Sequence, residues 1–384
     1  MSRKLITIST IMTLMSTSVI ADVPNVAADI APIHSLVSRV MDGVGAPKLI
    51  VQSGASPHGY RLRPSEAKAL QDADHVFWMG EELTPWLDSA IGTLASKASV
   101  TTLLDQQGVI LHDFREGALF EAHDHSAHGD DDHDDHDDHD DHDDDKGHKD
   151  HDDHDDHDDH KDHDDHDDHD DHKDHDDHDD HDDHDDHDDH DDHDDHDDHD
   201  NHDDHKDHDD HDDHGSHDPH AWLSPENAKL WLNIIASKLS VSDPENAATY
   251  FMNAAAGQAE IEAMIAEVSA TLKPVQGGKF VVFHDAYQYF ENDFDFYASG
   301  AISLGDSSDP SPARIEKVQK RIRDEGIQCV LAEPQFKKGL VATVMEGSDA
   351  TASVIDPLGA ELETGPKLYT RLIKNMAKTL RNCL

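Results

Sequence analysis

The chain has little cysteine, little positive charge and no long internal apolar segment, and each shortage excludes something. No cysteine lies directly after the apolar N-terminal segment, so no lipid-attachment site is expected there. Thirty Lys and Arg residues against 87 Asp and Glu give a formal net charge of −57, which argues against a nucleic-acid partner. Beyond the N-terminus no segment has enough consecutive apolar residues to span a bilayer. The His-Glu-x-x-His and Gly-x-Ser-x-Gly motifs of hydrolases are absent.

Asp and His are abundant, and most of them lie in one stretch. Residues 123–218, here called the Asp/His run, repeat His-Asp-Asp with occasional Lys and hold 31 of the 37 histidines. So polar a segment cannot bury enough apolar surface to offset the entropy cost of ordering, and neighbouring Asp side chains repel one another. We therefore expect the run to be a disordered loop with many weak metal sites.

The N-terminus resembles a secretory leader. Arg3 and Lys4 precede an apolar stretch rich in Ser and Thr, and Val19 and Ala21 occupy the −3 and −1 positions of a cleavage site. A membrane anchor is the alternative, but the stretch is short for one. We expect a signal peptide at residues 1–21 and an exported mature chain.

Outside the run, short β-branched segments alternate with helical patterns, which indicates an α/β fold with parallel sheets on both sides of the run. The expected strands are 23–27, 49–52, 75–79, 99–103, 279–283, 328–332 and 352–355. Ser224-Pro225, Asp243-Pro244 and Ser311-Pro312 mark helix starts. The second of these starts predicts one long helix to about Leu272, or two helices hinged at Gly257.

The two cysteines, Cys329 and Cys383, form an even pair in an exported chain. Such a pair is more simply a disulfide than a metal or redox site. We expect it to join the C-terminal helix to the second sheet.

Six histidines lie outside the run, and three of them occupy positions that suit metal ligands. His58 follows a predicted strand, His220 precedes a helix start, and His284 ends a strand. Loops at the carboxyl ends of parallel strands converge, so these imidazoles could bind Zn²⁺, copper or nickel together. Asp356, just past another strand, is the candidate fourth ligand. The other three, His34, His75 and His112, are expected to be structural.

Five ordered motifs carry a family resemblance. They are Gly54-Ala55-Ser56-Pro57-His58, His220-Ala221-Trp222-Leu223-Ser224-Pro225, Phe283-His284-Asp285-Ala286-Tyr287, Ala332-Glu333-Pro334-Gln335-Phe336 and Asp356-Pro357-Leu358-Gly359. Together they resemble the zinc-receptor branch of the metal-binding periplasmic proteins of ABC importers, over nearly the whole chain from Asp22 to Leu384.

The resemblance implies two similar lobes joined by a rigid linking helix, with the metal held between them by His58, His220 and His284. The corresponding segments are 22–242 (including the run), 243–273 and 274–384. Because Pro57 stands where some zinc members carry Glu, Asp356 or a water is expected in the fourth position. The implied protein is a periplasmic monomer, not an enzyme, that delivers Zn²⁺ to a membrane permease.

Three alternatives stay open at the level of the sequence. Manganese receptors of the same superfamily use two histidines and two carboxylates, a harder donor set. A zinc hydrolase could use the same three histidines and a water, with Glu333 or Asp285 as base, although a carboxylate near a metal more often orients the ligands. A metal buffer would rely on the Asp/His run alone.

Overall fold

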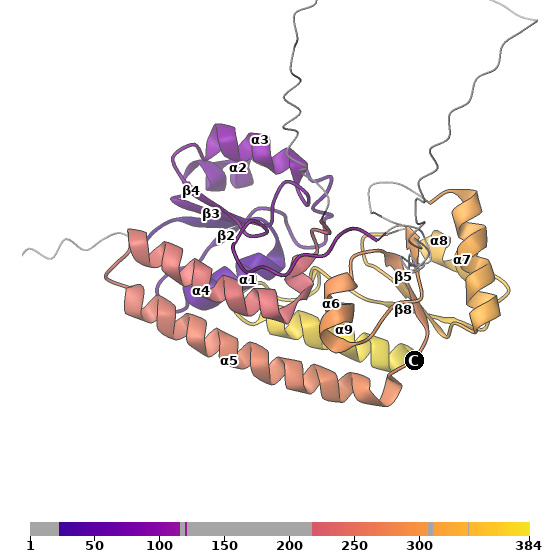
Figure 1. The fold of residues 1–384 in the computed structure, drawn as a ribbon. Coiled ribbons are helices and arrows are strands. Elements are labelled where there is room, and N and C mark those ends of the chain that lie inside the picture. Colours follow the sequence, from indigo (N-terminus) through magenta and orange to yellow (C-terminus); the bar gives the residue numbers. More distant parts are fainter. Residues whose placement is uncertain (1–22, 116–119, 121–216, 304, 306–309, 337) are drawn as a thin grey trace, which may run out of the picture. The chain divides into compact units, whose positions relative to one another are not determined.

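The computed structural model describes residues 23–115, 120, 217–303, 305, 310–336 and 338–384 (Figure 1). The predicted signal peptide and all of the Asp/His run except its last two residues lie outside these ranges. Two parallel sheets, each flanked by helices, make up the described part of the chain.

The first sheet precedes the run. It contains β1 (Val26–Ala28), β2 (Lys48–Leu49), β3 (His75–Trp78) and β4 (Ser99–Thr102), in the order β2-β1-β3-β4 with every pair parallel. Its connecting helices are α1 (Ala31–Val40), α2 (Pro64–Gln71) and α3 (Pro85–Leu94). Each of them has a proline in its first turn, a position where the missing N–H costs no helical hydrogen bond.

The second sheet repeats this arrangement after the run. It contains β5 (Phe280–His284), β6 (Ala301–Ser303), β7 (Cys329–Ala332) and β8 (Thr351–Val354), in the parallel order β6-β5-β7-β8. Its helices are α6 (Gln288–Phe294), α7 (Pro312–Glu325), α8 (Lys338–Met345) and α9 (Leu368–Cys383). The predicted α/β class with two similar sheet-based lobes is confirmed, while β6 is a strand that the sequence pattern did not predict.

Helix α5 (Ala247–Leu272) packs against α1 and α4 (Pro225–Ser242) at the first sheet and against α9 at the second (Figure 1). Its buried residues recur every three or four positions: Tyr250, Ala254, Gly257, Ile261, Met264, Val268 and Leu272. This spacing places them on one helical face. Among the described residues no helix is long and apolar enough to cross a membrane.

Two details of α5 differ from the sequence interpretation. The helix begins at Ala247 rather than Pro244. The Asp243 side chain accepts hydrogen bonds from the side-chain amide of Asn246 and from the Tyr250 hydroxyl, both 2.7 Å long, and these bonds stabilise a turn before the helix. The helix is also continuous through Gly257. A Cβ on Gly257 would lie 2.9 Å from Cδ1 of Leu232 in α4, so this glycine allows close helix packing and is not a hinge.

The predicted disulfide is confirmed. Cys329 of β7 and Cys383 at the end of α9 are bonded, with a Cα–Cα distance of 5.6 Å. The bond closes a loop of 54 residues, for which the chain-entropy model gives a stabilisation of roughly 4 kcal/mol. It fastens the C-terminal helix to the second sheet.

Gly257→Ala should destabilise the protein by about 1–3 kcal/mol, because the methyl group meets the fully buried Leu232. Gly92→Ala, in α3, is the matched control, since a Cβ there meets nothing within 4 Å. There the higher helix propensity of Ala should stabilise the fold by up to about 1 kcal/mol. Thermal and denaturant unfolding of both variants tests the pair, and equal effects would contradict this account of Gly257.

Candidate metal site

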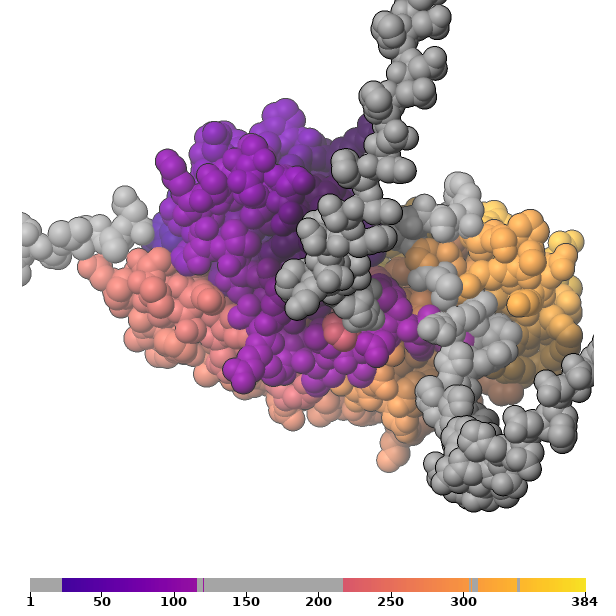
Figure 2. All heavy atoms as spheres, turned by 45° about the horizontal axis from the view of Figure 1, so that its top comes forward, coloured from indigo at the N-terminus to yellow at the C-terminus, as the bar shows by residue number. Residues whose placement is uncertain are grey.

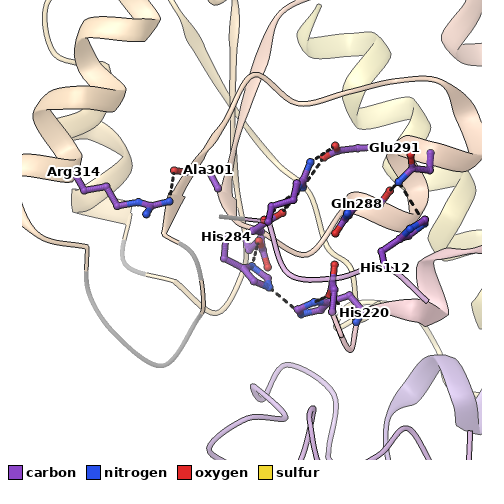
Figure 3. Close-up of polar contacts among 12 residues, drawn as sticks. His112, His220, His284, Gln288, Glu291, Ala301 and Arg314 are labelled. Atoms are coloured by element: carbon purple, nitrogen blue, oxygen red, sulfur yellow. Dashed lines mark hydrogen bonds and ion pairs between the residues drawn. The ribbon is translucent and has the colours of Figure 1, made fainter. Parts of the chain in front are cut away.

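His220 and His284 form the centre of the candidate site. His284 is the last residue of β5, and His220 immediately precedes a 3-10 turn, η2 (Ala221–Leu223). Both side chains are buried, and Figure 3 shows their rings directed toward one another. Their Nε2 atoms are 3.4 Å apart. Two nitrogens that each lie about 2.0–2.1 Å from a tetrahedral ion are separated by about 3.3–3.4 Å, so the pair has the spacing of two ligands of one ion.

A buried carboxylate holds the other nitrogen of each ring. Nδ1 of His220 lies 2.6 Å from Oδ1 of Asp218, and Nδ1 of His284 lies 2.6 Å from Oε1 of Glu333. A carboxylate only accepts, so these contacts assign the ring hydrogen to Nδ1 and leave a lone pair on Nε2. Two lone pairs that face each other across 3.4 Å repel, and a cation between them would convert the repulsion into attraction.

His58, the third predicted ligand, lies beside this pair. It is half-buried in the loop between β2 and α2, and its ring centroid is 5.7 Å from that of His220. The indole of Trp86 donates to the carbonyl of Pro57 over 2.7 Å and so fixes the adjoining backbone. The structure therefore brings together three histidines that are far apart in the sequence.

The site is only partly formed for a metal. Within the described residues no group of three or more His, Cys, Asp or Glu side chains is arranged to hold an ion. His220 and His284 have the spacing of two ligands of one ion, and the ring centroid of His58 lies 5.7 Å from that of His220.

Asp356, the predicted fourth ligand, has a structural role in the turn after β8. Its Oδ1 accepts from the backbone N–H groups of Leu358 and Gly359, and its Oδ2 accepts from that of Ala360. Asp356 and Glu333 line the same cavity of about 630 Å³ beside α9. Asp356 is therefore close to the site, but its carboxylate oxygens are already engaged by three backbone donors.

The remaining histidines outside the run have other partners. The ring Nε2 of His34 lies 3.1 Å from the carbonyl of Pro47, and that of His75 lies 2.7 Å from the Ser242 hydroxyl. The ring of His112 packs on Tyr289. These contacts agree with the structural roles expected for all three.

A second group of charges adjoins His284. Asp285 and Glu291 are buried, and both bind the guanidinium of Arg115. Burial raises the pKa of both carboxyls, while Arg115 opposes the rise. Arg115 was not singled out in the sequence, because a lone Arg beside a low-complexity run carries no pattern. Asp218 was likewise counted as part of the run.

Comparison with known proteins shows the family. Residues 26–383 match the sequence model of ZnuA, described as the periplasmic component A of a zinc-uptake complex. The chain belongs to the ZnuA family. The high-affinity zinc uptake system protein ZnuA of Brucella abortus (strain 2308) is 43% identical over 359 residues, which is 94% of this chain and 91% of that protein. The same-named protein of Paracoccus denitrificans is 40% identical over 365 residues, 95% and 93% of the two chains.

Solved structures share the fold. A crystal structure of ZnuA superposes with a TM-score of 0.61 at 18% identity, over 94% of this chain and 99% of that one. The solute-binding protein FpvC of Pseudomonas aeruginosa in complex with Mn²⁺ gives a TM-score of 0.62 at 15% identity, over 94% and 98%. ZnuA family members are periplasmic binding components, so the chain is a receptor and not a hydrolase.

The carboxylate contacts predict the tautomer of both rings. In Asp218→Asn and Glu333→Gln, the side-chain amide can either donate or accept, so His220 or His284, respectively, should lose its exclusive Nδ1–H form. Ring ¹⁵N shifts above the imidazole pKa, with His75 as internal control, measure this. Metal affinity should fall about 10–100-fold in both variants. Unchanged ring shifts in both variants would contradict the orienting role.

Proposed function

We propose that this protein captures Zn²⁺ outside the cytoplasm with His58, His220 and His284 and delivers it to the membrane permease of an ABC-type importer. The observation that carries the proposal is the His220–His284 pair, whose Nε2 atoms have the separation of two tetrahedral ligands and whose Nδ1 atoms bind carboxylates. The relatives named as zinc uptake proteins support the same ion. The family's description as a component of a zinc-uptake complex supports delivery to a permease.

The donor set favours zinc over manganese. Three imidazoles are borderline-soft ligands that suit Zn²⁺, whereas Mn²⁺ prefers carboxylate and water oxygens. For the fourth position we favour a water, because backbone N–H groups already take three of the about four acceptor sites of the Asp356 carboxylate. Asp356 itself remains the alternative ligand.

For the Asp/His run we propose an auxiliary role as a collector of metal. Its 31 histidines stand among Asp residues that favour the protonated imidazolium. Protons therefore compete with metal, and bound ions should be released as the pH falls. The run would raise the amount of metal held near the protein without taking part in the tight site.

Replacing His58, His220 or His284 by Ala should each weaken Zn²⁺ binding by more than about tenfold, because each change removes a ligand. All four tryptophans lie outside the run, and the Trp222 ring centroid is 5.2 Å from that of His220. Tryptophan fluorescence of the full chain in chelator-buffered zinc therefore reports the tight site.

His112→Ala is the control and should leave the affinity unchanged, while Asp356→Asn should cost less than any of the three His changes if a water is the fourth ligand. If the triple His variant binds zinc as tightly as the parent protein, the assignment is wrong.

Removal of the run should abolish the weak sites and keep the tight one, provided that the deletion ends before His217. Replacing residues 123–216 by a short Gly-Ser linker leaves Asp218 bonded to His220, whereas replacing 123–218 removes that carboxylate. Calorimetric titration should show one tight site in the first variant and a weakened site in the second. In the parent protein, lowering the pH should empty the weak sites first. Equal stoichiometry before and after deletion would refute the collector role.

A further inference from the structure

Arg115 links the segment after β4 to Asp285, which directly follows His284, and to Glu291 of α6. The segment reaches this point through two contacts, because the Ile110 backbone bonds with the Asn227 side chain of α4 and the His112 N–H donates to the Tyr289 hydroxyl of α6. Figure 2 shows magenta atoms of this segment beside orange atoms of the second half of the chain. The Arg115 guanidinium thereby comes to lie against the β5–α6 region.

The guanidinium binds two carboxylates at once. Its Nε donates to both oxygens of Asp285, at 3.0 and 3.1 Å, and its Nη2 also bonds Asp285. Its Nη1 donates to Glu291 over 2.6 Å. The ring of Phe120 covers the guanidinium, with Cζ 3.6 Å from the ring centroid. The Arg115 guanidinium is therefore a largely buried cation that bridges two carboxylates.

Asp285 is a potential competitor for the metal. It follows His284 directly, its side chain is 7% exposed, and the nearby Asp218 carboxylate adds to the rise of its pKa. A carboxylate at this place, if free to turn, would add a hard oxygen donor to a set of imidazoles. Its contacts with Arg115 instead engage both of its oxygens.

We propose that Arg115 determines the metal selectivity of the site by holding the Asp285 carboxylate away from the bound ion. The inference rests on the proposed function, because it takes His220 and His284 as ligands. With Asp285 held by Arg115, the ion meets imidazoles and a water. With Asp285 released, the site gains an oxygen ligand and approaches the mixed donor set that suits Mn²⁺.

Two double variants with the same formal charge test this. Arg115→Gln with Glu291→Gln leaves Asp285 without its guanidinium partner, while Arg115→Gln with Asp285→Asn leaves Glu291 without that partner. Both remove Arg115 and one buried acid, so any loss of packing and any change in net charge are matched. Each is made in the full chain, and fluorescence in chelator-buffered Zn²⁺ or Mn²⁺ gives the two dissociation constants.

The ratio of the Mn²⁺ to the Zn²⁺ dissociation constant should fall on the order of tenfold in the variant that keeps Asp285. It should stay within about twofold of the parent value in the variant that keeps Glu291. Arg115→Lys, which retains a charge but loses the fork, should shift the ratio less in the same direction. This single change also serves if either double variant does not fold.

Equal shifts in both double variants would overturn the proposal, because they would reflect general electrostatics. An unchanged ratio in every folded variant would overturn it as well. Neither result would contradict the assignment of His58, His220 and His284 as ligands, as long as replacing them still abolishes tight binding. If both double variants lose thermal stability to the same extent, that loss is a structural effect of removing Arg115. The ratio of the two dissociation constants then still decides between the outcomes.

Discussion

The candidate site depends on two hydrogen bonds, Asp218 to His220 and Glu333 to His284. Each bond fixes which nitrogen of the ring carries hydrogen and in which direction the other lone pair points. The repulsion between the two lone pairs, 3.4 Å apart, is retained in the fold because the carboxylates and the surrounding chain hold both rings in place. A cation bound between the two Nε2 atoms would turn this repulsion into attraction.

The fold supplies these groups from the carboxyl ends of parallel strands. His284 ends β5, Glu333 follows β7 and Asp356 follows β8. Since β5 and β7 are hydrogen-bonded neighbours, a carboxylate after one strand comes within reach of the imidazole that ends the other. Figure 1 shows α5 beside both α4 and α9, and one apolar core includes residues of both sheets and of these helices. This packing gives the histidines of the two halves a fixed framework.

Much of this was predictable from residue patterns. Seven of the eight strands in the described part of the chain were expected within a few residues, since Val- and Phe-rich segments such as β5 have strong strand propensity. Strand β6 escaped prediction because Ala301 and Ser303 carry little propensity, and the strand exists through its pairing with β5. The three histidines were predicted as a set from their positions after strands and before a helix, together with the family resemblance.

The groups that orient the histidine rings and neutralise the buried carboxylates were less predictable. Glu333 belongs to a recognisable motif, but Asp218 is chemically identical to its 52 Asp neighbours in the run, and only the fold distinguishes it. Arg115 stands alone in the sequence, and its role arises from burial beside Asp285 and Glu291. Pairwise contacts between distant segments decide such roles, and no periodicity or local spacing encodes them.

The position of Asp218 also explains how a long insertion can coexist with a precise site. Asp113 and His217 pair across the base of the run, and the Asp218 N–H donates to the His112 carbonyl over 2.8 Å. Asp218, which holds His220, therefore follows this bridge in the sequence. Closing a loop costs only about 0.6 kcal/mol more for each doubling of its length, so the repeat number can change with little effect on stability. Of the run, only His217 and Asp218 belong to the described part of the chain, and these two residues connect the bridge to the site.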